Sequence, residues 1–124
     1  MTASPIAIGT APIDGGVLIS VAGEVDLLTA DELTEALAAA VARHALVVVD
    51  LTAVAFLSSS GLAALALAHR AAVAADHVLR LVATCRVTLR PIQITGMADD
   101  IAVFATVPDA VAGAAPTDAP TERR

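Results

Sequence analysis

The chain has 124 residues, enough for one domain with a two-layer core. It is 57% hydrophobic but only 2% aromatic, and 13 acidic residues against 7 basic ones give a formal net charge of −6. These values argue against nucleic-acid binding, because single strands stack on aromatic side chains and phosphates need a basic surface.

The mean hydropathy of +0.80 raises the question of a membrane span. The most apolar stretch, residues 56–75, contains three serines, His69 and Arg70. Because an arginine at the bilayer centre costs about 2.5–3.5 kcal/mol on insertion scales, we expect no span. The N-terminus lacks the features of a signal peptide, and the single cysteine, Cys85, cannot form an internal disulfide. These features predict a cytoplasmic protein.

The N-terminal part predicts a β-hairpin. Residues 14–16, Asp-Gly-Gly, separate two apolar runs at 6–13 and 17–22. Asp-Gly supplies the positive φ angles that a tight hairpin turn needs. Residues 23–26, Gly-Glu-Val-Asp, then predict a short acidic loop.

A helix is expected next. Thr29 and Glu32 have capping-box spacing, and Leu28 and Leu33 are placed to form a hydrophobic staple. Apolar residues then recur with helical period and predict the buried face: Leu33, Ala36, Leu37, Ala40 and Val41.

The middle of the chain predicts a buried strand and a second helix. Residues 45–51 contain three consecutive valines, a pattern typical of a strand covered on both faces. A linker ending at Phe56-Leu57 leads to Ser58-Ser59-Ser60-Gly61, and an Ala- and Leu-rich helix is expected over 62–75.

The C-terminal part continues the alternation. Residues 78–83 predict a strand, and 88–95 a short helix with Pro91 in its first turn and Gly96 as its cap. Residues 101–107 predict the last strand, followed by one helical turn.

A hairpin followed by alternating strands and helices predicts an α/β fold with a mixed sheet of about five strands and helices packed on it. We expect this domain to span residues 1–112. Residues 113–124, rich in Ala, Pro, Thr and charge, predict a disordered tail.

Ser58-Ser59-Ser60-Gly61 is the main candidate site. Serine is a favoured helix N-cap, and capping accounts for one of the three serines. The other interpretation uses the partial positive charge of a helix N-terminus, which tolerates a phosphate. A phosphoserine adds about −1.5 to −2 charge to its surroundings and can act as a switch. On physical grounds alone, capping ranks slightly ahead.

Glu24 and Asp26 form the second candidate. Solvated loop carboxylates are the simpler interpretation, whereas the functional one is that they dock a basic partner or repel a nearby phosphoserine. Their spacing supplies no third metal ligand, and the three histidines lack metal-ligand spacing, so no metal site is predicted.

Enzymatic activity is not predicted. A hydrolase nucleophile elbow needs Gly-x-Ser-x-Gly, but Leu57 and Ser58 stand two positions before Ser59 and Ser60. There is no glycine-rich phosphate loop of the Walker or dinucleotide type. We expect a binding protein without a cofactor, and a small hydrolase acting through Ser60 is kept as a third interpretation.

The order of these motifs resembles that of STAS domains, specifically of bacterial anti-sigma factor antagonists. The similarity covers roughly residues 5–112 and rests on the hairpin and on four segments, residues 23–27, 47–51 with Asp50, 56–62 and 95–96.

The resemblance implies a mechanism. The unphosphorylated chain would bind an anti-sigma factor that is also a serine kinase, releasing a sigma factor and regulating transcription in a bacterial stress response. The kinase would phosphorylate the serine directly before the glycine, which is Ser60, with Ser59 the less favoured acceptor. A PP2C-type phosphatase would reset the switch.

The resemblance also implies a partner-binding surface. Asp26, with Glu24 beside it, maps onto the carboxylate of the kinase-facing surface, and Ser59 and Gly61 belong to the same surface. Ser58 stands where the family usually has aspartate, which removes one negative charge beside the phosphoacceptor.

The alternative is a STAS scaffold or adaptor that acts without phosphorylation, in a larger assembly or a lipid-transport complex. Ser58 in place of aspartate gives it weight. Neighbouring genes would distinguish the two hypotheses, and no oligomeric state is predicted.

Overall fold

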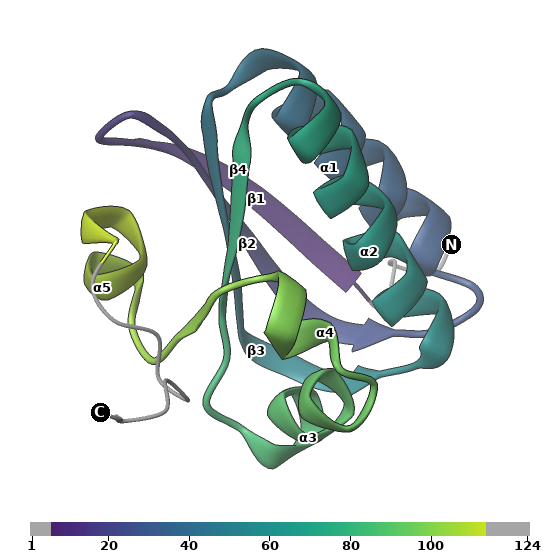
Figure 1. The fold of residues 1–124 in the computed structure, drawn as a ribbon. Helices are drawn as coiled ribbons and strands as arrows, with labels where there is room; N and C mark the ends of the chain where they lie inside the picture. Colours follow the sequence, from purple (N-terminus) through teal and green to yellow (C-terminus); the bar gives the residue numbers. More distant parts are fainter. Residues whose placement is uncertain (1–5, 114–124) are drawn as a thin grey trace.

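Five strands form one mixed sheet in the computed structural model, which describes residues 6–113 (Figure 1). Their order in the sheet follows the chain; β1 and β2 are antiparallel, and every later pair is parallel. The predicted α/β class and mixed five-stranded sheet are thereby confirmed. The strands are β1 (Ile6–Ile13), β2 (Gly16–Val25), β3 (Leu46–Leu57), β4 (Val78–Val82) and β5 (Val103–Phe104).

The helices cover both faces of this sheet unequally. α1 and α2 lie side by side on one face with α3 and α4 beyond them, and α5 lies on the opposite face (Figure 1). The main core lies under α1 and α2, and a smaller cluster lies under α5. The helices are α1 (Ala30–Arg43), α2 (Ser59–Ala74), α3 (Arg86–Ile94), α4 (Met97–Asp100) and α5 (Val107–Ala112).

The predicted hairpin is confirmed, but the prediction of an acidic loop at residues 23–26 is wrong for most of that segment. Ile13 pairs with Gly16 around the Asp14-Gly15 turn, where Gly15 has a φ of 81°. β2 then continues to Val25, which is completely buried and pairs with Leu57. Residues 23–25 are therefore strand, because β3 is long enough to pair with them.

β3 is also longer than predicted. Val47, Val48 and Val49 are 0% exposed, as their pattern indicated. The linker expected after residue 51 is instead the second half of the strand, which ends at Leu57. Val54 and Leu57 are buried in it, and register shifts against β2 accommodate the irregular alternation.

Four of the five residues predicted for the buried face of α1 are confirmed as buried. The predicted hydrophobic staple between Leu28 and Leu33 is wrong. Leu33, Leu37, Ala40 and Val41 are buried, and Ala36 is half-buried. Leu28 is 88% exposed and Leu33 is 0% exposed, so the two do not form a hydrophobic staple.

The boundaries of the later elements differ from the sequence prediction. α2 begins at Ser59, three residues early, and α3 begins at Arg86, which places Pro91 at its sixth position instead of in its first turn. The last strand, β5, has only two residues because it pairs only with the end of β4. The predicted helical turn after it is α5.

No helix within residues 6–113 is both long and apolar enough to cross a membrane. Of the predicted tail, Gly113 caps α5 and residues 114–124 lie outside the described residues. The boundary at residue 112 stays a prediction.

Candidate functional site

The serine turn lies where β3 ends, beside the end of β2. The Ser58 N–H donates to the Val25 carbonyl at 2.9 Å. This bond ties the start of α2 to the segment between Glu24 and Asp26. The fold thus brings the predicted site residues to one end of the sheet, where α1 and α2 both begin (Figure 1, lower right).

Ser58 is the N-cap of α2. Its backbone is extended, with φ −84° and ψ 175°, and its Oγ accepts a hydrogen bond from the Gly61 N–H at 3.3 Å. Serine and aspartate are about equally good N-caps, since both place an oxygen near an unpaired N–H. Ser58 can therefore do the capping that an aspartate would do at this position.

Gly61 is buried where the first turn of α2 presses on the sheet. A Cβ on this residue would lie 2.7 Å from Leu57 Cδ1 and 2.7 Å from Val25 Cγ1. Contacts that short force a neighbouring side chain to move, so glycine allows the helix to begin this close to both strands. The packing explains why Gly61 follows the serines.

Ser59 and Ser60 occupy the first two positions of α2. Ser59 is exposed and Ser60 is half-buried. Neither hydroxyl takes part in a hydrogen bond among residues 6–113. The first turn of a helix carries unpaired N–H groups and a partial positive charge, which favour an anion. Both free hydroxyls therefore lie where an attached phosphate would be stabilised.

Asp26 holds the loop before α1. Its Oδ1 accepts hydrogen bonds from the Leu28 N–H at 2.9 Å and the Thr29 N–H at 3.2 Å. In return, the Asp26 N–H donates to Thr29 Oγ1 at 2.9 Å. This reciprocal pattern is that of a capping box, three residues before the predicted one. The Thr29 side chain makes no cap hydrogen bond to α1, so the predicted box is wrong in position.

Glu24 is exposed near the end of β2 and pairs in register with Phe56. Its carbonyl accepts a hydrogen bond from Thr29 Oγ1 at 2.8 Å, so Thr29 connects the strand end to the loop. The backbone of Glu24 is therefore fixed next to Val25, whose carbonyl accepts the hydrogen bond from Ser58.

Exposed leucines next to these residues were not predicted as site residues. Leu27 is 78% exposed and Leu28 is 88% exposed, in the loop that Asp26 holds. Leu67, two turns into α2, is 49% exposed. Two adjacent leucines in a short loop before a helix were the available sequence signal; the staple interpretation wrongly assigned Leu28 to the core.

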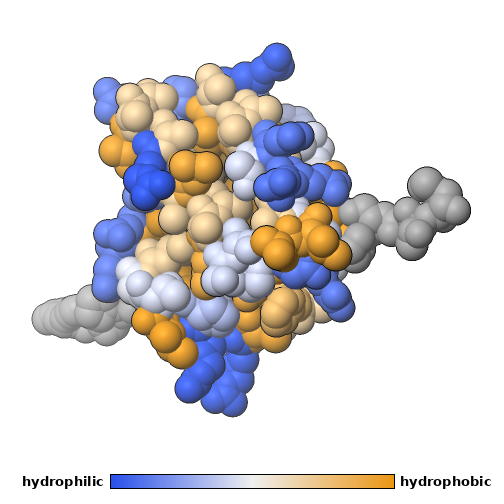
Figure 2. Space-filling view, turned by 90° about the vertical axis from the view of Figure 1, so that its right-hand side faces the viewer, coloured by the Kyte–Doolittle hydropathy of each residue, from blue (hydrophilic) through white to orange (hydrophobic). Residues whose placement is uncertain are grey.

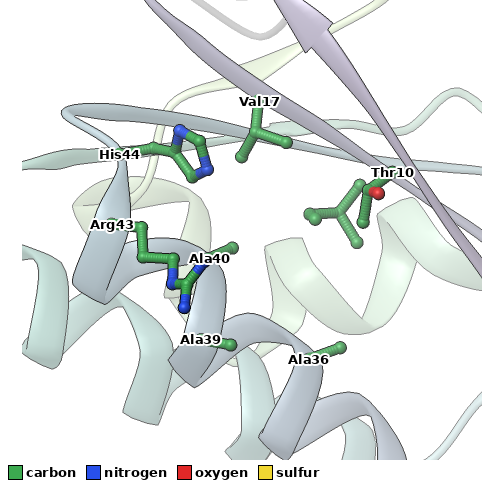
Figure 3. Close-up of a pocket in the computed structure, with 8 residues that line it drawn as sticks. Thr10, Val17, Ala36, Ala39, Ala40, Arg43 and His44 are labelled. Carbon is green, nitrogen blue, oxygen red and sulfur yellow. The ribbon is translucent and has the colours of Figure 1, made fainter.

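A separate hollow of about 330 Å³ lies at the other end of α1, between that helix and the hairpin (Figure 3). Arg43 and His44 lie at one end of it, with Val17 beside His44 and Thr10 on the far side. Its lining contains none of the predicted site residues and no carboxylate. Across residues 6–113, no group of three or more His, Cys, Asp or Glu is placed to hold a metal ion.

The sequence model of the STAS domain matches residues 8–110. The chain belongs to the STAS domain family. That match includes every site residue discussed above.

Individual relatives agree with this assignment. The chain is 38% identical to the anti-sigma-F factor antagonist RsfB of Mycobacterium tuberculosis over 109 residues, 87% of this chain and 88% of the relative. An anti-sigma factor antagonist from Mycobacterium paratuberculosis has a similar crystal structure, with a TM-score of 0.82 and 35% identity over 87% of this chain and 92% of the other. The phosphorylated form of SpoIIAA from Bacillus shares the fold, with a TM-score of 0.68 and 17% identity over 86% of this chain and 98% of the other.

Proposed function

We propose that this chain is an anti-sigma factor antagonist. The support comes from relatives of that description, 38% and 35% identical, which align along most of their length with this chain. It would bind the anti-sigma factor through the end of the sheet where Ser58, Ser59, Gly61, Glu24 and Asp26 come together. The protein would act in the cytoplasm as a regulator of transcription and not as an enzyme.

We further propose that phosphorylation of Ser60 switches this binding off. The observation that carries this proposal is that the serines of the turn differ in hydrogen bonding. Ser58 Oγ caps α2, whereas the Ser60 hydroxyl makes no hydrogen bond and is partly exposed. Ser59 is the second free hydroxyl. The family pattern, in which the serine directly before the glycine is modified, favours Ser60.

The location suits a switch. A phosphate at the second position of a helix meets free N–H groups and the positive end of the dipole, so the fold tolerates it. The same phosphate adds about −1.5 to −2 charge to a surface that already carries Glu24 and Asp26. Binding of the partner would fall while the domain stays folded.

The partners follow from the same proposal. The anti-sigma factor would itself be the serine kinase, and a PP2C-type phosphatase would restore the free hydroxyl. The adaptor hypothesis drew on Ser58 in place of aspartate. Ser58 caps α2 as an aspartate would, so the substitution keeps the start of the helix and changes only the charge beside Ser60.

Labelling by the kinase tests the acceptor. When the chain is incubated with the host's anti-sigma factor kinase and labelled ATP, we expect Ser60→Ala to abolish phosphate incorporation. Ser59→Ala is the matched control, because it removes the neighbouring hydroxyl from the same turn, and it should retain incorporation. Unchanged labelling of Ser60→Ala would contradict the assignment, and loss in Ser59→Ala alone would move it by one residue.

A further inference from the structure

A groove runs between α1 and α2 and begins at Ser60. A hollow of about 330 Å³ at the start of the two helices is lined by Ser60, Leu27, Ala30, Asp31, Thr34 and Leu67, among others. A smaller hollow of about 40 Å³ continues along the helices and shares Thr34, Ala64 and Leu67 with the first. The two hollows therefore adjoin between the helices, and together they are called the groove.

The groove is apolar. Figure 2 faces the side of the molecule that carries α1 and α2, and hydrophobic residues gather over its middle while hydrophilic ones lie mostly toward its margins. The hydroxyl of Thr34 is engaged by the Ala30 carbonyl at 2.8 Å. The polar groups left to the groove are chiefly the Ser60 hydroxyl and the Asp31 carboxylate.

Two large apolar side chains border the groove without being covered. Leu27 is 78% exposed and Leu67 is 49% exposed. Single exposed leucines need no explanation, but these two border one hollow that a proposed switch residue also lines, which makes the groove a candidate interaction surface. The Asp26 capping box fixes the backbone around Leu27, so little backbone entropy would be lost there when a partner binds.

The charges at the Ser60 end of the groove are acidic, and the exposed Arg70 follows only one turn after Leu67 on α2. Asp31 lines the groove on the α1 side, and Glu35 is exposed one turn further along the same helix. On the α2 side, the first charged or titratable residue after Ser59 is His69. An occupant that complements this arrangement carries an apolar stripe with basic residues along one flank.

We propose that this groove receives the apolar face of an amphipathic helix of the anti-sigma factor, with Arg or Lys residues of that helix facing Asp31 and Glu35. Laying an amphipathic helix in an apolar groove is a common mode of recognition. The inference rests on the proposed function and adds the chemistry of the partner and the place where it binds.

The position of Ser60 then explains how a phosphate would act. Its side chain lines the groove, so a phosphate would enter the space that the partner's apolar side chains occupy. Burying a dianion against those side chains is unfavourable because the charge would lose its hydration among apolar atoms, while the basic residues of the partner face Asp31 and Glu35 on α1. The modification therefore blocks the groove directly.

Calorimetric titration of the full chain with the host's anti-sigma factor tests the proposal. Leu27→Gln and Leu67→Gln should each raise Kd by about tenfold or more, as expected for apolar anchors at an interface. Val73→Gln is the matched control: Val73 is 59% exposed on the same helix but outside the groove. It should change Kd by less than about twofold. Leu27 lies in a loop before α1, so Leu27→Gln remains informative even if Leu67→Gln disturbs folding.

The outcomes separate the groove from the proposed function. If both leucine variants bind like the wild type while Ser60→Glu weakens binding, the groove proposal fails and the antagonist function stands. If the wild type does not bind, both fail. If sedimentation shows that the chain alone dimerises and Leu67→Gln makes it monomeric, the groove belongs to a second copy and the proposal is overturned.

Discussion

At the scale of single residues, Asp26 has a role that its charge does not suggest. One carboxylate oxygen is engaged by the N–H groups of Leu28 and Thr29, so the side chain holds the loop. In the proposed function, Asp26 would contribute to partner binding by keeping Leu27 and Leu28 in position. The charge itself adds to the field at this end of the sheet.

Substitution of Asp26 separates these two roles. Asp26→Ala removes the cap acceptor and should lower the free energy of unfolding by about 1 kcal/mol, whereas Asp26→Asn keeps an acceptor oxygen and should lower it by less. Urea unfolding measures both. Equal stability of the alanine and asparagine variants would show that the Oδ1 hydrogen bonds contribute nothing to the loop.

At the scale of elements, short sequence patterns predicted those elements that depend on neighbouring residues in the chain. The hairpin follows from its Asp-Gly turn, and α1 follows from the spacing of Leu33, Leu37 and Val41. The ends of β2 and β3 could not be predicted in this way, because each is strand only through pairing with the other, as Val25 with Leu57.

In the candidate site, too, some features could be predicted from the local sequence and others could not. The serine turn and the acidic pair were predicted from residue types and family resemblance. The capping box at Asp26 was missed because Thr replaces the Glu or Gln expected at its third position. The groove was missed because it requires two helices, α1 and α2, distant in the chain to lie side by side.

The role of α5 can be tested at this scale. α5 covers Val48, Val82 and Phe104 on the far face of the sheet, and Arg80 from β4 donates to the Ala110 carbonyl at 2.8 Å. Truncation after Thr106 exposes this cluster and should lower the free energy of unfolding by about 2 kcal/mol or more. Thermal unfolding measures the loss.

The same truncated chain should still bind the anti-sigma factor, because α1 and α2 lie on the opposite face (Figure 1). Loss of binding by a truncated chain that remains folded would place part of the interface on α5.

At the scale of the whole molecule, the formal charge of −6 acts on association. A basic partner is attracted over distances comparable to the Debye length, and the acidic residues around the groove orient its approach.

We therefore expect the association rate with the anti-sigma factor to fall several-fold as salt rises from about 0.05 to 0.5 M, with a smaller change in the dissociation rate. Stopped-flow measurements provide both rates. Asp31→Asn should flatten the salt dependence, and Asp14→Asn, in the hairpin turn at the other end of β2, is the matched control. An association rate that does not change with salt would contradict a basic partner.

The loop between Asp26 and Thr29 is held by hydrogen bonds of Asp26 to the backbone N–H groups of Leu28 and Thr29 and to the Thr29 hydroxyl. Its shape is thus independent of the side chains at Leu27 and Leu28, which are almost fully in solvent. A duplicated gene could exchange these two residues and recognise a different anti-sigma factor while keeping the fold and the phosphoacceptor. Insulation of parallel stress pathways from crosstalk would then depend on two positions that evolution can change at almost no cost in stability.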